Sequence, residues 1–124
     1  MKTKPITIYK PFSIVIVPFP FADIVKSKKR PALVVSTEKF QQENAHISLF
    51  MITSAKHSQW FGDYLIQNLK QAGLPIESYV RQKLFTVDSR LIEKQIGTLS
   101  KKEITAIKAL CHRCSAQLRG VSGI

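Results

Sequence analysis

The stretch Lys28-Lys29-Arg30-Pro31-Ala32-Leu33-Val34-Val35-Ser36 passes in one step from three consecutive cations to an apolar run. Proline has no backbone N–H and is tolerated at the first residue of a strand, and the run from Ala32 to Val35 predicts a strand buried on both faces. Arg30 is therefore expected at the mouth of a rigid strand, with its guanidinium pointing out of the preceding loop. A planar, permanently charged group on such a mount suits the binding of a phosphate.

A second apolar run, Ile47–Ile52, predicts another strand, and this one leads directly into Thr53 and Ser54. If the two strands are neighbours in one sheet, both hydroxyls and Arg30 share a pocket. The simpler interpretation stays open at this point. A Thr-Ser pair after a strand is common in turns, and an arginine at a strand mouth is commonly a solvated surface group.

Short strands account for most of the remaining chain. They are expected at Ile14–Val17, Asp63–Ile66, Glu77–Arg81 and Leu84–Asp88, the last two being separated by Gln82-Lys83. The polar segment 37–45 is expected to be a connection with at most one helical turn, and 89–97 has no clear pattern. Residues 1–10 are expected to form a tail, in part an edge strand.

The clearest helix lies at the C-terminus. Ser100 and Glu103 have the spacing of a capping box, and Gly120 is the expected stop. The apolar residues that follow at helical spacing are Ile104, Ile107, Leu110, Cys111, Cys114 and Leu118. A shorter helix is expected at 68–72, closed by Gly73. The fold class is therefore α+β, mainly β: one domain over 1–124, a small barrel or strongly bent sheet with a C-terminal amphipathic helix.

The charge balance restricts the partners. Nineteen Lys and Arg residues against eight Asp and Glu give a net charge of +11, which favours nucleic acid first, then a membrane surface or an acidic protein. The most apolar stretch, 12–25, is too short and too interrupted to span a bilayer and has no signal-peptide cleavage site, so a cytoplasmic protein is expected.

Two cysteines stand three residues apart, in Cys111-His112-Arg113-Cys114. This is the spacing of one zinc-ligand pair, but a structural site usually needs two pairs and the sequence has no second one. Both cysteines also lie on the apolar face of the C-terminal helix. Buried core cysteines, and no metal site, are the prediction.

Several of these motifs in this order resemble the MazF/PemK family of toxin endoribonucleases, in its Pro-Phe-Pro-Phe branch. They are Ile14–Asp23 (IVIVPFPFAD), Lys28–Ser36 and Ile52-Thr53-Ser54, followed by Ala72-Gly73-Leu74, Val80-Arg81, Leu84–Asp88 and Ile96–Ser100. The resemblance covers roughly residues 9 to 118. It implies an SH3-like barrel, a homodimer, a cognate acidic antitoxin, and cleavage of single-stranded RNA that needs no metal or other cofactor.

By the same resemblance, Arg30 takes the place of the family's catalytic arginine and Thr53 that of its catalytic threonine, with Ser54 as a further candidate. Two positions depart from the commonest family pattern. Phe12-Ser13 stand where Gly-Asp is common, and the loop 24–29 contains neither the Gly nor the Glu of a Gly-Ser-Glu-Gln pattern.

Basic residues around the expected pocket are the candidates for RNA binding. They are Lys26, Lys28, Lys29, Lys56, His57, Arg81 and Lys83. Trp60 and Phe61 can stack a base, although loop aromatics also commonly pack on a barrel or at a dimer interface. Two other functions stay open: a non-catalytic SH3-like module that binds nucleic acid, and a protein-targeting toxin like the gyrase-poisoning relatives that share the barrel.

Overall fold

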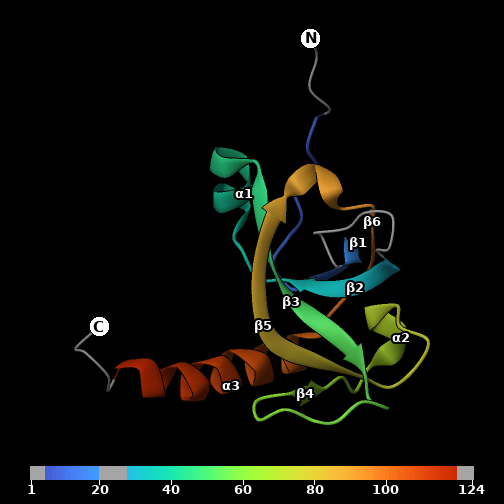
Figure 1. Cartoon of the computed structure of the whole chain (residues 1–124), viewed down its shortest axis with the longest axis vertical. Helices are drawn as coiled ribbons and strands as arrows, with labels where there is room; N and C mark the ends of the chain where they lie inside the picture. The colour runs from blue at the N-terminus through green and yellow to red at the C-terminus, as the bar shows by residue number, and fades with distance from the viewer. Residues whose placement is uncertain (1–4, 20–27, 120–124) are drawn as a thin grey trace.

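The architecture is a strongly curled antiparallel sheet with helices at its margins (Figure 1). The computed structural model describes residues 5–19 and 28–119, and within these ranges six strands pair in the order β4-β5-β3-β2-β1-β6. The strands are β1 Ser13–Phe19, β2 Lys28–Val34, β3 His46–Ser54, β4 Tyr64–Leu65, β5 Ser78–Asp88 and β6 Lys94–Thr98. The helices are α1 Glu38–Asn44, α2 Leu69–Ala72, the 3₁₀ turn η1 Ser89–Leu91 and α3 Lys101–Arg119. The predicted mainly-β class with a C-terminal helix is confirmed.

Both faces of the central strands are buried. Along β1 and β2 the side chains alternate between two apolar clusters, so that Ile14 and Leu33 belong to one and Val15 and Val34 to the other. The first cluster is covered by α2, α3 and the segment between β4 and β5, through Ile66, Leu74 and Ile107 among others. This two-sided burial explains why the strands are continuous apolar runs in the sequence rather than alternating ones.

The strand that carries Arg30 begins four residues earlier than predicted. β2 starts at Lys28, so the three cations lie in the strand and Pro31 in its middle, where it pairs with Ile16 of β1. The pairing of β2 with β3 spans only Ala32 to Val34. Pro31 is tolerated because β2 is paired on one side alone at this position, where a missing N–H costs no ladder hydrogen bond on the open side.

Two further predictions are corrected in the second half of the sheet. The segments expected as separate strands on either side of Gln82-Lys83 are one strand, β5, with a bulge there: Phe50 of β3 pairs with Leu84, and Met51 with Arg81. The extra residues bend β5 without ending it, which a sequence pattern of period two cannot show. The segment 89–97, which has no clear pattern, contains η1 and most of β6.

The polar segment before β3 is a helix, α1, and not a connection with a single turn. Thr37 caps it by accepting a hydrogen bond from the N–H of Phe40 at 3.1 Å. Its buried Gln41 bonds to the backbone of Tyr9 twice, accepting from the N–H at 2.8 Å and donating to the C=O at 2.7 Å. Residues 5–10 form no strand, and at Tyr9 the Gln41 amide bonds to both backbone groups that a sheet edge would otherwise pair.

Two glycines allow α2 and β6 to pack backbone against backbone. A Cβ on Gly97 would lie 2.3 Å from the carbonyl carbon and oxygen of Ala72, and Gly73, with φ +75°, ends α2 as predicted. Phe12, which stands where the resemblance leads one to expect glycine, has φ 70° and so adopts the left-handed conformation that glycine takes without strain.

The last helix starts as predicted and leaves the body of the molecule. The hydroxyl of Ser100 accepts the N–H of Glu103 at 3.3 Å, while Ile104, Ile107 and Cys111 pack against the first cluster. Its C-terminal part extends away from the sheet (Figure 1). Cys111 is half-buried at the edge of the first cluster and not fully buried as predicted, whereas the Cys114 side chain and Gly120 lie outside the described residues.

Candidate active site

The ends of β2 and β3 and the turn that follows β3 enclose a cavity of about 240 Å³. Arg30 lines it from β2, Thr53 and Ser54 from the end of β3, and His57 from the turn. Leu74, Pro75 and Ile76, which follow α2, also line the cavity. The structure thus brings together the three catalytic candidates and two of the RNA-binding candidates, Lys29 and His57, from positions up to 28 residues apart in sequence.

Strand register explains why Arg30 and Thr53 meet. Ala32 pairs with Met51, and in an antiparallel pair the same register, continued by two residues, sets Arg30 opposite Thr53 on the same face of the sheet. The ladder itself ends at Ala32, next to Pro31, which has no N–H to extend it. The two strand ends are therefore neighbours without being hydrogen-bonded, which leaves room for a ligand between them.

Arg30 and Thr53 are two groups in this cavity that are open to a ligand. Arg30 is exposed, and it takes no part in the ion pairs found among the described residues. Thr53 is half-buried, and within the same part of the chain its hydroxyl has no hydrogen-bond partner. Ser54 is already engaged, since its Oγ accepts the N–H of Lys56 at 3.2 Å and its C=O the N–H of His57 at 3.1 Å. Ser54 therefore also builds the turn that presents His57.

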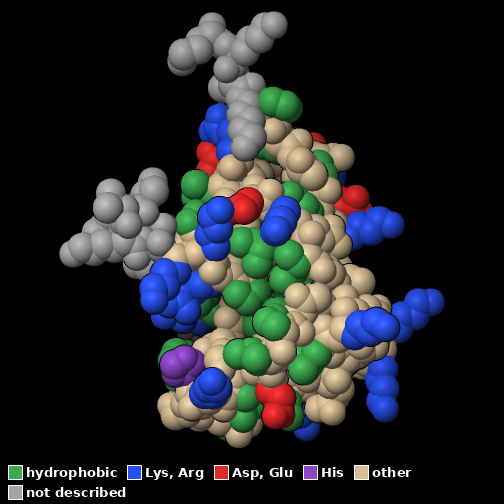
Figure 2. Space-filling model, turned by 90° about the vertical axis from the view of Figure 1, so that its right-hand side faces the viewer, with side chains coloured by type: hydrophobic (Ala, Val, Ile, Leu, Met, Phe, Trp, Pro, Cys, Tyr) green, Lys and Arg blue, Asp and Glu red, His purple; other side chains and the backbone are tan. Residues whose placement is uncertain are grey.

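A second cavity, of about 350 Å³, adjoins the first. The two share Ser54 and Ile76, and the second is further lined by Ala55, Lys56 and Glu77. Together they form a depression that runs from Arg30 past Thr53 to Lys56. Seen from the side of the molecule that carries α2, Lys and Arg side chains border a band of hydrophobic side chains (Figure 2). Lys and Arg side chains next to hydrophobic ones can contact a partner that has both negative charges and apolar surfaces.

Three of the predicted RNA-binding cations are placed away from this depression or are only partly available to it. The ammonium of Lys29 pairs with Glu93 at 2.9 Å, although the residue lines the first cavity. The pair is exposed, so it holds Lys29 only weakly. Lys83 lies in the β5 bulge with its Nζ 5.6 Å from the ring centre of Phe19. Lys28 is exposed at the start of β2, opposite Phe19 of β1. Lys26 lies outside the described residues.

Arg81 is engaged within the protein. Its guanidinium donates to both carboxylate oxygens of Asp63, at 3.1 and 2.8 Å, and to the C=O of Ser58 at 2.8 Å, and it lies 4.2 Å from the ring centre of Trp60. The Asp63 side chain is 1% exposed. The hydrogen bonds to Asp63 raise the pKa of Arg81. These contacts show that Arg81 braces the loop 55–63, while its role in RNA binding stays a prediction.

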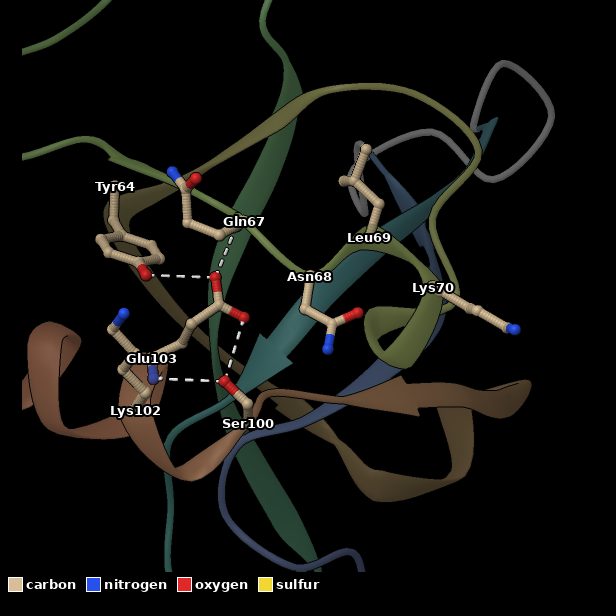
Figure 3. Close-up of a pocket in the computed structure, with 8 residues that line it drawn as sticks. All are labelled: Tyr64, Gln67, Asn68, Leu69, Lys70, Ser100, Lys102 and Glu103. Atoms are coloured by element: carbon tan, nitrogen blue, oxygen red, sulfur yellow. Dashed lines mark hydrogen bonds between the residues drawn. The ribbon is translucent and has the colours of Figure 1, made fainter.

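A larger cavity, of about 520 Å³, lies elsewhere, between α3 and the segment from β4 to α2 (Figure 3). At its edge the buried carboxylate of Glu103 accepts hydrogen bonds from the Tyr64 hydroxyl at 3.1 Å, the Gln67 N–H at 2.5 Å and the Ser100 hydroxyl at 3.4 Å. Burial and the Glu103 carboxylate raise the pKa of Tyr64 to about 12. Because three donors satisfy this carboxylate, we assign it to anchoring α3 and not to chemistry. The capping box is modified accordingly: Glu103 bonds to the neighbouring segment.

Two negative findings apply to the described residues. Among them no group of three or more His, Cys, Asp or Glu side chains is arranged to hold a metal ion. Within the same ranges no helix combines the length and apolar character needed to cross a membrane.

A comparison with protein families decides the relationship. Residues 10–113 match the family described as the PemK-like, MazF-like toxin of type II toxin-antitoxin systems. The chain belongs to this family. The match spans the whole candidate site, from β1 into α3. Members of this toxin family are generally endoribonucleases.

Solved structures of family members share the fold at low sequence identity. MazF from Deinococcus radiodurans superposes with a TM-score of 0.65 at 16% identity, covering 95% of this chain and 99% of the other. The Mycobacterium tuberculosis toxin MazF-mt6 gives 0.64 at 19% identity, with 79% and 90% covered. An endoribonuclease in complex with its cognate antitoxin, from a mycobacterial species, gives 0.64 at 9% identity, with 82% and 89% covered. A comparison with curated proteins gives no significant match.

The segment after α2 is the part of the site that the sequence did not indicate. In the sequence Gly73 marked the end of a helix, and Ala72-Gly73-Leu74 carried part of the family resemblance. Neither signal placed Leu74, Pro75 and Ile76 at the cavity, which they line beside Arg30. Ile76, which is 48% exposed, lies at the edge shared by the two cavities.

Proposed function

We propose that this family member is an endoribonuclease that cleaves single-stranded RNA by attack of the substrate's own 2′-hydroxyl, with no metal ion. The observation that supports this is the shared cavity: an exposed guanidinium and a hydroxyl, neither with a partner among the described residues, lie at two adjacent strand ends. Arg30 binds the scissile phosphate and Thr53 donates a hydrogen bond to one of its oxygens. Lys56 and His57, at the next turn, bind the flanking backbone.

The reaction requires little more than these groups. The 2′-oxygen attacks phosphorus and loses its proton, while the bond from phosphorus to the 5′-oxygen breaks and that oxygen gains a proton. The products are a 2′,3′-cyclic phosphate and a 5′-hydroxyl. Charge accumulates on the phosphoryl oxygens of the transition state, where a planar guanidinium donates two parallel hydrogen bonds. His57 is the only one of the described histidines that lines the cavity, and an imidazole there can also transfer a proton.

The direct test is incubation of the purified protein with single-stranded RNA in EDTA, followed by analysis of the ends. Cleavage that leaves 2′,3′-cyclic phosphate supports the proposal. Binding without cleavage supports the alternative, an SH3-like nucleic-acid-binding module. Cleavage that EDTA abolishes would refute the metal-independent mechanism.

We also propose a homodimer and an acidic antitoxin as protein partners. With a net charge of +11 and an exposed Arg30, the depression attracts an acidic segment that folds on binding, and such a segment would compete with RNA. Sedimentation tests the dimer. Titrating antitoxin peptide into the complex with a non-cleavable RNA tests the shared site: a ternary complex with unchanged RNA affinity would refute it.

A further inference from the structure

A buried ion pair between Arg81 and Asp63 braces the loop 55–63, together with a hydrogen bond from the Gln82 side chain to the C=O of Gly62 at 3.2 Å. Besides its bonds to Arg81, Asp63 accepts the N–H of Trp60 at 2.8 Å through Oδ2, and its own N–H donates to the C=O of Trp60 at 3.1 Å. The four residues from Trp60 to Asp63 thus form a tight turn. Arg81 connects this turn to Ser58, one residue after His57 of the cavity.

This braced turn exposes two aromatic side chains. Phe61 is 87% exposed and Trp60 48%, although the Arg81 guanidinium lies against the Trp60 ring. A phenylalanine this exposed contributes little to the core, so it is not packed on the barrel. A large apolar group held out on an ordered turn marks an interaction surface.

The charges around the turn favour RNA over protein as the occupant. Lys56 and His57, on the same loop, are exposed and lead from the cavity toward the turn. The only acidic side chain of the loop, Asp63, is neutralised by Arg81. Cations next to exposed aromatic rings are the pattern by which proteins bind unpaired nucleotides, the cations holding phosphates and the rings stacking bases.

We propose that Phe61, supported by Trp60, is a stacking site for an unpaired RNA base that extends the catalytic depression along the loop 55–63. The inference rests on the proposed function, since it assumes RNA in that depression. Arg81 is then a positioning residue: it does not touch RNA but fixes the turn that presents the ring.

A binding experiment with a blocked substrate tests this. The probe is a short, fluorescently labelled single-stranded RNA carrying 2′-O-methyl groups throughout, which removes the nucleophile and so prevents cleavage. Its affinity is measured by anisotropy, and the quenching of the chain's single tryptophan is followed in the same titration. The variants are Phe61→Ala, Phe61→Leu and Phe61→Tyr, with Leu84→Ala as a control that removes another exposed apolar side chain, 62% exposed, on β5.

We expect Phe61→Ala to weaken binding roughly 5- to 150-fold, as the loss of one stacked base does, with an unchanged melting temperature. Phe61→Leu should weaken binding as well, while Phe61→Tyr and Leu84→Ala should bind like wild type. An abasic version of the probe should abolish both the quenching and the difference between wild type and Phe61→Ala.

Three outcomes overturn the inference: Phe61→Ala binds the probe like wild type, Phe61→Leu binds like wild type, or Phe61→Ala changes only self-association in sedimentation, which would assign the turn to a protein contact. Failure of the proposed function looks different. Wild type would then bind the blocked probe in a Phe61-dependent way but leave unblocked RNA intact. If wild type binds no RNA, both are refuted.

Discussion

Breaking the Arg81–Asp63 pair should destabilise the protein more than its place in a surface loop suggests. Arg81→Met keeps the length of the side chain but leaves the Asp63 carboxylate, 1% exposed, with only the Trp60 N–H as a partner. Removing one partner of a buried ion pair lowers the free energy of unfolding by about 3–5 kcal/mol. Because the Arg81 side chain is itself 12% exposed, we expect a loss at the lower end of this range, about 3 kcal/mol. Asp63→Asn should lower the free energy of unfolding by less, because the Arg81 guanidinium can reach water with a small movement.

Urea unfolding of the wild type, both single variants and the double variant measures how far the two residues act as a unit. The double variant should be about as stable as the less stable single variant, with a coupling energy of about 1–3 kcal/mol. Arg90 and Asp88 provide the control pair: they are also hydrogen-bonded, but their side chains are 40% and 30% exposed, so the coupling energy between them should be clearly smaller than that between Arg81 and Asp63. Additive effects at Arg81 and Asp63, within about 0.5 kcal/mol, would refute the assignment of this pair as the brace of the loop.

Three other predictions concern the anchoring of α3, the packing of α2 and the charge of the surface. Because the pKa of Tyr64 is raised to about 12, the protonated side chain stabilises the fold fully below its ordinary pKa, and this stabilisation is lost as the pH rises from about 10 to 12. In an ultraviolet titration of tyrosinate, the ionisation of Tyr64 should move to lower pH in Glu103→Gln. An unchanged ionisation would contradict the contact between Tyr64 and Glu103. Gly97→Ala should destabilise by about 1–3 kcal/mol or more in thermal or urea unfolding, since its Cβ meets the Ala72 backbone, and a neutral effect would mean that α2 can move away from β6. The logarithm of RNA affinity against the logarithm of salt concentration should fall with a slope of about −0.7 for each phosphate contacted, and a flat plot would assign the net charge of +11 to another partner.

The sequence was sufficient for the parts of the fold in which burial dictates residue type. The apolar runs of β1, β2 and β3 and the amphipathic pattern of α3 follow from burial, and so they were predictable with small errors at the ends. Thr53 was placed correctly at a strand end, and the proximity of Arg30 to it could be foreseen from two strands that each end in polar residues. The motifs that carry the family resemblance lie on these same strands.

The errors arise where tertiary pairing overrides a local signal. Pro31 marked a strand start in the sequence, but the open side of β2 lets it sit mid-strand. Gln82-Lys83 suggested a break, which the structure accommodates as a bulge. Arg81 looked like one more surface cation because nothing local reveals that Asp63, 18 residues earlier, is buried against it. The periodicity of apolar residues reports local burial and cannot predict a charge pair between residues far apart in the sequence.

The central claim, that Arg30 stabilises the transition state of RNA cleavage, is tested most directly by the single-turnover cleavage rate of Arg30→Ala in EDTA. Lys39→Ala removes an equal charge from the exposed side of α1 and controls for net charge. We predict that Arg30→Ala cleaves roughly 10²–10³-fold more slowly than wild type at saturating enzyme, with a much smaller loss of affinity for the blocked RNA, whereas Lys39→Ala cleaves normally. A rate for Arg30→Ala within a few-fold of wild type would contradict the account.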